Sequence, residues 1–230
     1  MRVLRAQRLS GARGAYGTVV VIDVLRAFTT AAYALASGAS AIELVASPEE
    51  AIARKAVDPE LVLVGEVGGR PIAGFDHGNS PERMRALDLA GRTLVLRSSS
   101  GVQGALAALA TCEALLLGSL VTAAATVRVV RGLGGDTTLV AMGAGSGIGP
   151  DGPEDDACAD LLAARLEGRP IDEAEIERRV RASPAALLAL DPAVDWITQG
   201  DVELALALDR FDFAVEARLE GGMVVARRRS

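Results

Sequence analysis

Short apolar runs rich in valine, isoleucine and leucine recur between residues 2 and 167, and stretches of helical length separate them. Apolar runs of roughly 4–8 residues are typical of strands buried on both faces. The predicted strands cover residues 2–9, 17–23, 41–45, 61–65, 92–96, 113–117 and 137–142. The predicted helices cover residues 25–37, 81–88, 121–133 and 154–167, and others begin near 47 and 101. This alternation predicts a three-layer α/β/α fold around a mostly parallel or mixed central sheet.

The pattern changes after Arg169. Residues 171–181, 184–190 and 201–208 are predicted to form charged, amphipathic helices. The last 20 residues alternate in two runs around Glu220-Gly221-Gly222, which is the signal of a β-hairpin. Because no repeat or low-complexity linker interrupts the chain, we expect one domain over residues 1–230. Residues 170–230 would form its more helical C-terminal portion.

Composition narrows the class of protein further. Half of the residues are hydrophobic but only 3% are aromatic, so we expect a core of alanine, valine and leucine. The formal net charge of −6 does not suggest a nucleic-acid or anionic-membrane partner. No apolar run reaches the roughly 18 residues that span a bilayer, and the N-terminal stretch lacks an apolar signal core. We therefore expect a cytoplasmic protein.

The few histidines and cysteines limit the chemistry that is available. His77 is the only histidine, so a zinc or iron site with several histidines is excluded. A role as a hydrogen-bonding loop residue is favoured for His77 over a catalytic one. Cys112 and Cys158 have no metal-binding or redox spacing, and we expect them to act as small buried residues.

The stretch LVLVGEVGGRPIAGFDHGNSP, residues 61–81, has the features of an anion site. A predicted strand runs into a glycine-rich loop with Glu66 and Arg70, and a second such loop leads to Pro81, which would open a helix. Free backbone N–H groups at a helix start bind anions. A carboxylate beside an anion is costly unless a cation joins them, which favours a bound divalent metal. An ordinary loop with capping residues is the alternative.

Polar side chains and glycines follow five of the predicted strands, and ligands of parallel sheets bind at the carboxyl ends of strands. These positions are Asp23 and Arg26, Glu66 and Arg70, Ser98–Gly101, Gly118 and Ser119, and the glycine-rich loop 143–153 with Glu154, Asp155 and Asp156. Oxygen ligands without histidine favour Mg²⁺, and arginines with helix N-termini favour phosphate. Together they predict metal-assisted phosphoryl transfer or phosphate-ester hydrolysis.

Three familiar phosphate-binding arrangements are excluded. Lys55 is the only lysine and no G-x-x-x-x-G-K-[ST] motif is present, so the chain is not a P-loop protein. The glycines of residues 143–149 do not fit G-x-G-x-x-G. Neither cysteine has an arginine six residues later, which excludes the loop of a cysteine-dependent phosphatase.

The segments IDVLRAFTTAAYALASGA, GEVGG, GFDHGNSP, GSLVTAAA and PEDDACA together resemble the 2-phosphosulfolactate phosphatase family of coenzyme M biosynthesis. The similarity extends over about residues 17–165, and GFDHGNSP and the Asp-x-x-Arg of DVLRA are its most specific parts. The resemblance implies an α/β/α fold, dependence on Mg²⁺, and hydrolysis of (R)-2-phospho-3-sulfolactate to 3-sulfolactate and phosphate. A small phosphorylated acid is therefore the expected binding partner.

The matching positions carry the resemblance residue by residue. They are Asp23 and Arg26 in DVLRA, Glu66 in GE, Asp76, Asn79 and Ser80 in GFD-x-GNSP, and Glu154 and Asp155 in ED. Three positions depart from the family pattern: Val67 replaces an arginine, Ser100 replaces an asparagine, and Asp160 replaces a glycine. Loss of an arginine and an amide weakens recognition of a substrate with phosphate, sulfonate and carboxylate groups. The reaction class is thus better supported than the substrate.

From these residues we expect Mg²⁺ to be held by Asp23, Glu154 and Asp155, with Glu66 as a fourth candidate ligand. Arg26 and Arg70 would neutralise phosphate and sulfonate charge on the substrate. The predicted catalytic residues are Asp23, Arg26 and Glu66. The predicted substrate contacts are Arg70, Asp76, Asn79, Ser80, Ser99, Ser100 and Gly101. A covalent aspartyl intermediate through Asp23 is the competing scheme.

Each feature has a simpler structural explanation. Asp23 could cap its own helix, the acids at 154–156 could favour a helix N-terminus, and the serines at 98–100 could be caps. At the level of function, a non-catalytic anion-binding protein of the same fold is one alternative. An interaction protein that uses helices 171–209 is another. An alanine- and leucine-rich surface helix would also be compatible with a homodimer.

Overall fold

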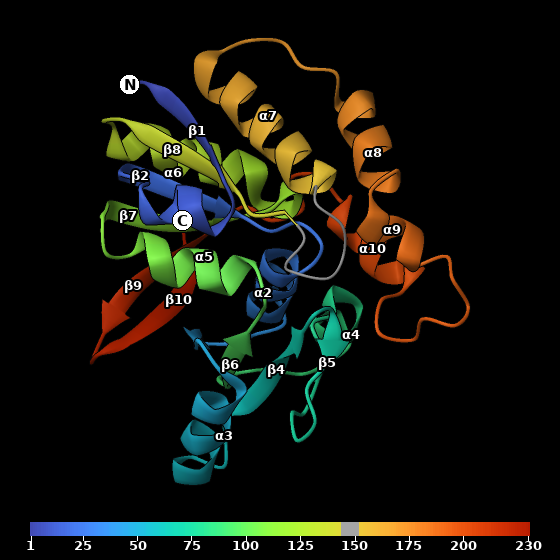
Figure 1. Ribbon diagram of the computed structural model, residues 1–230. Coiled ribbons are helices and arrows are strands. Elements are labelled where there is room, and N and C mark those ends of the chain that lie inside the picture. Colours follow the sequence, from blue (N-terminus) through green and yellow to red (C-terminus); the bar gives the residue numbers. More distant parts are fainter. Residues whose placement is uncertain (144–151) are drawn as a thin grey trace.

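Ten strands form one sheet in the computed structural model, which describes residues 1–143 and 152–230 (Figure 1). The strands are β1 (Val3–Gln7), β2 (Gly17–Ile22), β3 (Ala41–Leu44), β4 (Val62–Val67), β5 (Arg70–Pro71), β6 (Thr93–Arg97), β7 (Cys112–Gly118), β8 (Thr137–Ala141), β9 (Ala214–Glu220) and β10 (Met223–Arg229). The helices are α1 (Arg8–Arg13), α2 (Ala27–Ala36), α3 (Pro48–Val57), α4 (Pro81–Arg85), α5 (Gly101–Ala108), α6 (Ala123–Leu133), α7 (Pro153–Glu167), α8 (Glu173–Arg181), α9 (Pro184–Leu188) and α10 (Gln199–Ala205), and the short 3₁₀-helix η1 (Leu120–Thr122) precedes α6. The predicted α/β fold with C-terminal helices and a terminal hairpin is confirmed.

The sheet consists of two parallel groups joined by the C-terminal hairpin. Its order is β1-β8-β2-β7-β9-β10-β3-β6-β4-β5. Strands β1, β8, β2 and β7 are parallel to one another, and so are β3, β6 and β4. The pairs β7–β9, β9–β10 and β10–β3 are antiparallel. The two groups therefore run in opposite directions, and the hairpin lies at the centre of the sheet, not at its margin.

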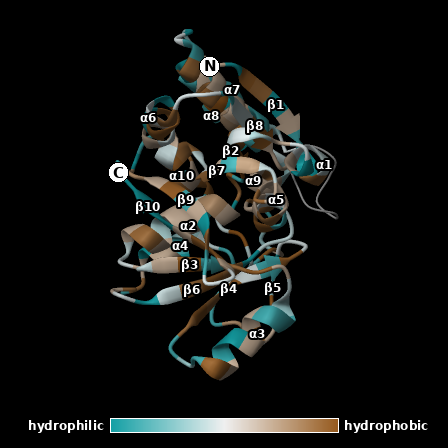
Figure 2. Ribbon diagram, turned by 90° about the vertical axis from the view of Figure 1, so that its left-hand side faces the viewer, coloured by the Kyte–Doolittle hydropathy of each residue, from teal (hydrophilic) through white to brown (hydrophobic). Residues whose placement is uncertain are grey.

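Alternate residues of the buried strands face different cores, as the two-residue period of a strand requires. In β2, Val19 and Val21 belong to the core that contains α2 and α5, whereas Val20 and Ile22 belong to the core that contains α6 and α7. A smaller cluster places Ala51 of α3 against Leu63 of β4. Helices thus cover both faces, and the brown, hydrophobic segments lie in the interior between them (Figure 2).

Helix α2 lies between the two parallel groups in both views (Figures 1 and 2). Its Phe28 is fully buried in a core that also contains Val21 and Leu117 of one group and Leu96 and Val64 of the other. Both groups therefore pack against the same helix. This shared core is the reason why loops from oppositely directed strands can meet at one place.

The ends of the helices follow local sequence signals. Ser47 accepts a hydrogen bond from the amide of Glu50 and Pro48 occupies the first turn of α3. Gly38, with φ at +102°, follows the end of α2. Helix α1 was not predicted, because RLSGAR has no apolar period and buries only Ala12. Within the described ranges, no helix has the length and apolar character needed to cross a membrane.

Candidate active site

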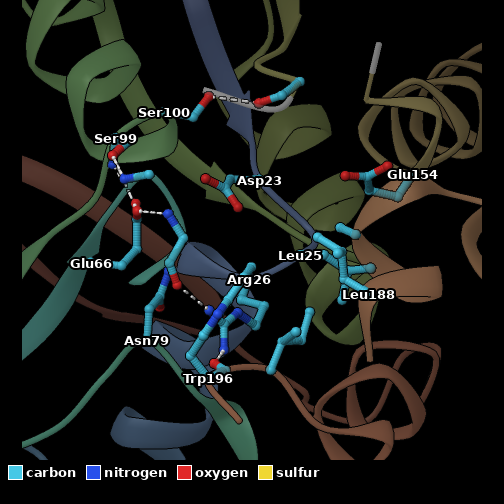
Figure 3. Close-up of a pocket in the computed structure, with 15 residues that line it drawn as sticks. Asp23, Leu25, Arg26, Glu66, Asn79, Ser99, Ser100, Glu154, Leu188 and Trp196 are labelled. Atoms are coloured by element: carbon cyan, nitrogen blue, oxygen red, sulfur yellow. Dashed lines mark hydrogen bonds between the residues drawn. The ribbon is translucent and has the colours of Figure 1, made fainter. Parts of the chain in front are cut away.

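A pocket opens where the loops after β2, β4, β6 and β8 meet the segment around α9 and α10 (Figure 3). Its polar wall consists of Asp23, Arg26, Glu66, Asn79, Ser99, Ser100 and Glu154. Its apolar wall consists of Leu25, Ala185, Leu188, Trp196 and Ile197. The site therefore combines carboxylates from the strand ends and the start of α7 with apolar side chains that come mostly from the C-terminal portion of the chain.

Asp23 is held by backbone amides from two directions. It follows β2 directly, and its Oδ1 accepts a hydrogen bond of 2.9 Å from the amide of Ala27 at the start of α2. Its Oδ2 accepts one of 2.9 Å from the amide of Gly101 at the start of α5. Burial, with a smaller contribution from the charge of Glu66, raises the pKa of Asp23 to about 6. Asp23 therefore caps the start of α2, as the simpler explanation from the sequence suggested, and its carboxylate also lines the pocket.

Glu66 joins the loop after β4 to the loop after β6. Its Oε2 accepts hydrogen bonds from the amide of Gly69 at 2.6 Å and from the hydroxyl of Ser99 at 3.1 Å, and its Oε1 accepts one from the amide of Ser99. Only 6% of Glu66 is exposed. The neighbouring Val67, which departs from the family pattern, is 49% exposed.

Arg26 is almost completely buried in the pocket wall. Its guanidinium donates hydrogen bonds to Asp201 at 3.3 Å, to the carbonyl of Gly69 at 3.1 Å, and to the carbonyl of Trp196. Its carbon Cζ also lies 5.9 Å from the centroid of the Trp196 ring. Burial lowers the pKa of Arg26, and Asp201 opposes this effect.

The first turn of α7 contributes two buried carboxylates with different surroundings. Asp155 accepts hydrogen bonds from the amides of Val24 at 2.7 Å and Gly143 at 2.9 Å, and it stands behind the pocket. Glu154 lines the pocket, 3% exposed, and its Oε2 has no hydrogen-bond partner. Burial, and then the charge of Asp23, raises the pKa of Glu154 to about 7. Burial, Glu154 and Asp23 raise the pKa of Asp155 well above its usual value.

Two further predicted residues complete the polar wall. Asn79 is 4% exposed, and its Oδ1 has no hydrogen-bond partner. The hydroxyl of Ser100 donates a hydrogen bond of 2.7 Å to the carbonyl of Gly143. A buried acceptor oxygen without a partner is costly, which is expected where a ligand or water donates the missing hydrogen bond.

The remaining predicted residues lie outside the pocket lining. Asp76 binds the amide of Leu63 at 2.7 Å and pairs with Lys55. Arg70 is exposed, with its Cζ 5.8 Å from the Trp196 ring centroid. Ser80 caps α4 and donates a hydrogen bond to Asp201. Gly101 stands behind Asp23. His77 is half-buried beside Val64, and most of the predicted glycine-rich loop, residues 144–151, lies outside the described residues.

The apolar wall and Asp201 were not predicted from the sequence. Trp196, Leu188 and Ile197 belong to a portion of the chain that appeared only to be helical and charged. Asp201 forms a capping box with Thr198 at the start of α10. The Thr-x-x-Asp spacing was the one local signal for this residue, but its contact with Arg26 has no local signal.

The donor set of the pocket suits a divalent cation. In residues 1–143 and 152–230, no three histidine, cysteine or acidic side chains lie close enough together to hold a metal ion. Mg²⁺ usually binds one or two carboxylates together with substrate phosphate and water, so it does not need such a cage. Asp23 and Glu154 are the two pocket carboxylates on adjacent elements whose pKa values are raised. Within the described residues, the Oε2 atom of Glu154 has no hydrogen-bond partner, whereas both oxygens of Asp23 accept hydrogen bonds from backbone amides.

Comparison with known proteins gives a consistent result. A family model described as 2-phosphosulpholactate phosphatase matches residues 4–210. The chain is 32% identical to a probable 2-phosphosulfolactate phosphatase of Bacillus subtilis, over 88% of this chain and 87% of that protein. A protein of the same description from Thermus thermophilus is 40% identical over 81% and 80%. Another, from Carboxydothermus hydrogenoformans, is 33% identical over 90% and 89%.

Proposed function

The chain belongs to the 2-phosphosulpholactate phosphatase family, and on this basis we propose that it is a Mg²⁺-dependent phosphoric monoester hydrolase. The candidate substrate is (R)-2-phospho-3-sulfolactate, which would yield 3-sulfolactate and phosphate. The observation that carries the proposal is the meeting of Asp23, Glu66 and Glu154 in one pocket with Arg26.

The charges in this pocket support the need for a cation. Among residues 1–143 and 152–230, three carboxylates and one guanidinium line it, and Arg26 is already paired with Asp201. A phosphate dianion would meet net negative charge there, which opposes binding unless positive charge is added. Bound beside Asp23 and Glu154, Mg²⁺ would supply that charge, polarise a phosphate oxygen and lower the pKa of a coordinated water.

The residues of the chain would have separate roles around the phosphate. Arg26 would face the anion with a guanidinium already fixed by three acceptors. Asn79 would use its unpartnered Oδ1 to accept a hydrogen bond from a donor of the bound substrate or its water. Asp23 has both oxygens in hydrogen bonds from backbone amides, which stabilise its charge and reduce its nucleophilicity. This arrangement favours a ligand role for Asp23 over a covalent aspartyl intermediate.

Phosphate release from (R)-2-phospho-3-sulfolactate tests the proposal. The purified protein is incubated with this substrate, and in parallel with p-nitrophenyl phosphate, in the presence of Mg²⁺ or of EDTA. We expect hydrolysis with Mg²⁺ and its loss with EDTA. If neither ester is hydrolysed, with Mg²⁺ or with EDTA, the proposed activity is rejected and a non-catalytic anion-binding protein is favoured.

A further inference from the structure

Asp201 is a completely buried carboxylate whose two oxygens receive four hydrogen bonds. Oδ1 accepts from the hydroxyl of Ser80 at 2.6 Å and the amide of Glu82 at 3.1 Å. Oδ2 accepts from the amide of Thr198 at 3.2 Å and from Nη1 of Arg26 at 3.3 Å. Its exposed fraction is 0%. The side chain of Asp201 therefore connects α4, the start of α10 and Arg26, which directly precedes α2.

Arg26 depends on this carboxylate for charge compensation. Asp201 is its ion-pair partner at 3.3 Å, and the side chains of Arg26 and Asp201 are 4% and 1% exposed, respectively. The other acceptors of Arg26, the carbonyls of Gly69 and Trp196, are neutral. An uncompensated buried guanidinium would be costly and free to move toward the pocket carboxylates Asp23 and Glu66, whose charges also act on Arg26.

We propose that Asp201 is a positioning residue of the active site, which holds the Arg26 guanidinium in the pocket wall so that it faces the phosphate. It does not itself line the pocket. The anion-binding part of this inference depends only on Arg26, whereas any effect on turnover rests on the proposed phosphatase activity.

The capping role of Asp201 can be separated from its contact with Arg26. Thr198 accepts a hydrogen bond from the Asp201 amide at 3.0 Å within their capping box, and its hydroxyl donates one of 2.7 Å to Glu82. In the described part of the chain, the three hydrogen-bond partners of the Arg26 guanidinium are Asp201, Gly69 and Trp196, so the Thr198 side chain is not among them. Thr198→Ala therefore weakens the start of α10 and leaves the ion pair in place. It is the matched control for Asp201→Asn, which keeps the size of the side chain and removes its charge.

The protein contains a binding reporter at this site, because Trp196 is its only tryptophan and lines the pocket. Fluorescence of Trp196 is followed while inorganic phosphate is added in the presence of Mg²⁺. We expect Asp201→Asn to weaken phosphate binding about tenfold or more, the order expected for loss of a hydrogen bond to a charged group. Thr198→Ala should bind within about twofold of the wild type, because it keeps the Thr198 amide that donates to Asp201 and the ion pair between Asp201 and Arg26.

A double-mutant cycle decides whether Asp201 acts through Arg26. In an Arg26→Gln background, Asp201→Asn should produce no further loss of phosphate affinity. If Asp201→Asn does not fold, as judged by circular dichroism, Asp201→Ser is used in the same cycle, because it is smaller and keeps a hydroxyl.

Three results would overturn the inference. The first is that the Asp201 variants bind phosphate as tightly as the wild type. The second is that Asp201→Asn lowers the phosphate affinity as much in the Arg26→Gln background as it does alone, and the third is that the wild type does not bind phosphate. Absence of hydrolysis with intact phosphate binding would instead reject the proposed function, and the cycle would still decide the role of Asp201.

Discussion

The amide of Gly101 donates a hydrogen bond of 2.9 Å to Oδ2 of Asp23, and this contact joins the two oppositely directed halves of the sheet at the pocket. A Cβ atom at residue 101 would lie 2.5 Å from Oδ2 and 2.7 Å from Cβ of Asp23. Glycine is therefore required here because of the close approach of an acidic side chain, not because of its backbone angles.

Gly101→Ala tests this requirement. The added methyl group would push the Asp23 carboxylate out of place, and we expect the rate of phosphate release to fall about 100-fold, as for a misplacement of about 1 Å. Gly132→Ala in α6 is the control, because no atom lies within 4 Å of its added Cβ. That variant should keep full activity and be slightly more stable. Equal activities in the two variants would contradict the structural role of Gly101.

Asp23→Asn tests the assigned carboxylate directly. The amide nitrogen of asparagine would face one of the two backbone N–H donors, and the negative charge would be lost. We expect kcat/KM to fall by roughly 10²–10⁴-fold, the range for loss of a positioned catalytic group. Asp136→Asn, which weakens the ion pair and hydrogen bonds of Asp136 with Arg2, both outside the pocket lining, is the control and should retain activity. An active Asp23→Asn enzyme would show that the metal and catalytic assignments of Asp23 are wrong.

The stability of the metal-free protein should fall as the pH rises from about 5 to about 8. The pKa values of Asp23 and Glu154 are raised by burial to about 6 and about 7. A carboxyl whose folded pKa exceeds its unfolded pKa favours the folded state when protonated, and this stability is lost as the pH rises through the folded pKa. Thermal unfolding in EDTA at several pH values measures the effect.

Mg²⁺ should reverse this loss, because cation binding compensates the same charges. The rise in Tm on addition of Mg²⁺ should be larger at pH 8 than at pH 5. Glu154→Gln lacks one of the two carboxyl groups with a raised pKa. Its Tm in EDTA should therefore depend less on pH, and its Tm should rise less on addition of Mg²⁺. A response to Mg²⁺ that does not depend on pH or on Glu154 would argue against this binding site.

Val67→Arg should improve the use of a substrate with several negative charges. Val67 is 49% exposed beside Gly68, which lines the pocket, and the family resemblance places an arginine here. The gain from one exposed charge pair is about 1 kcal/mol or less, so we expect kcat/KM for (R)-2-phospho-3-sulfolactate to rise by up to about fivefold. Activity toward p-nitrophenyl phosphate should rise less. Val57→Arg, on the 82% exposed end of α3, controls for net charge.

Local patterns were sufficient to predict most of the elements and part of the site. The run GTVVVI is buried at every position as β2, and the alternation around Gly221-Gly222 is the β9–β10 hairpin. Asp23, Glu66 and Glu154 could be identified as candidates because each follows a strand or opens a helix. Backbone propensity, capping and apolar period depend on a few neighbouring residues, so they can be recognised in the sequence alone.

Only the tertiary structure decided how these elements meet. The expected basis of the site was a common edge at the carboxyl ends of the strands in a mostly parallel or mixed sheet. The two parallel groups in fact run in opposite directions and meet around α2. Asp76, Ser80 and Asp155 have motif positions like those of Asn79 and Glu154, yet their side chains bind other partners. Arg26 and Asp201 are 175 residues apart in the chain. Their contact depends on which faces pack together, and no short stretch of sequence contains that information.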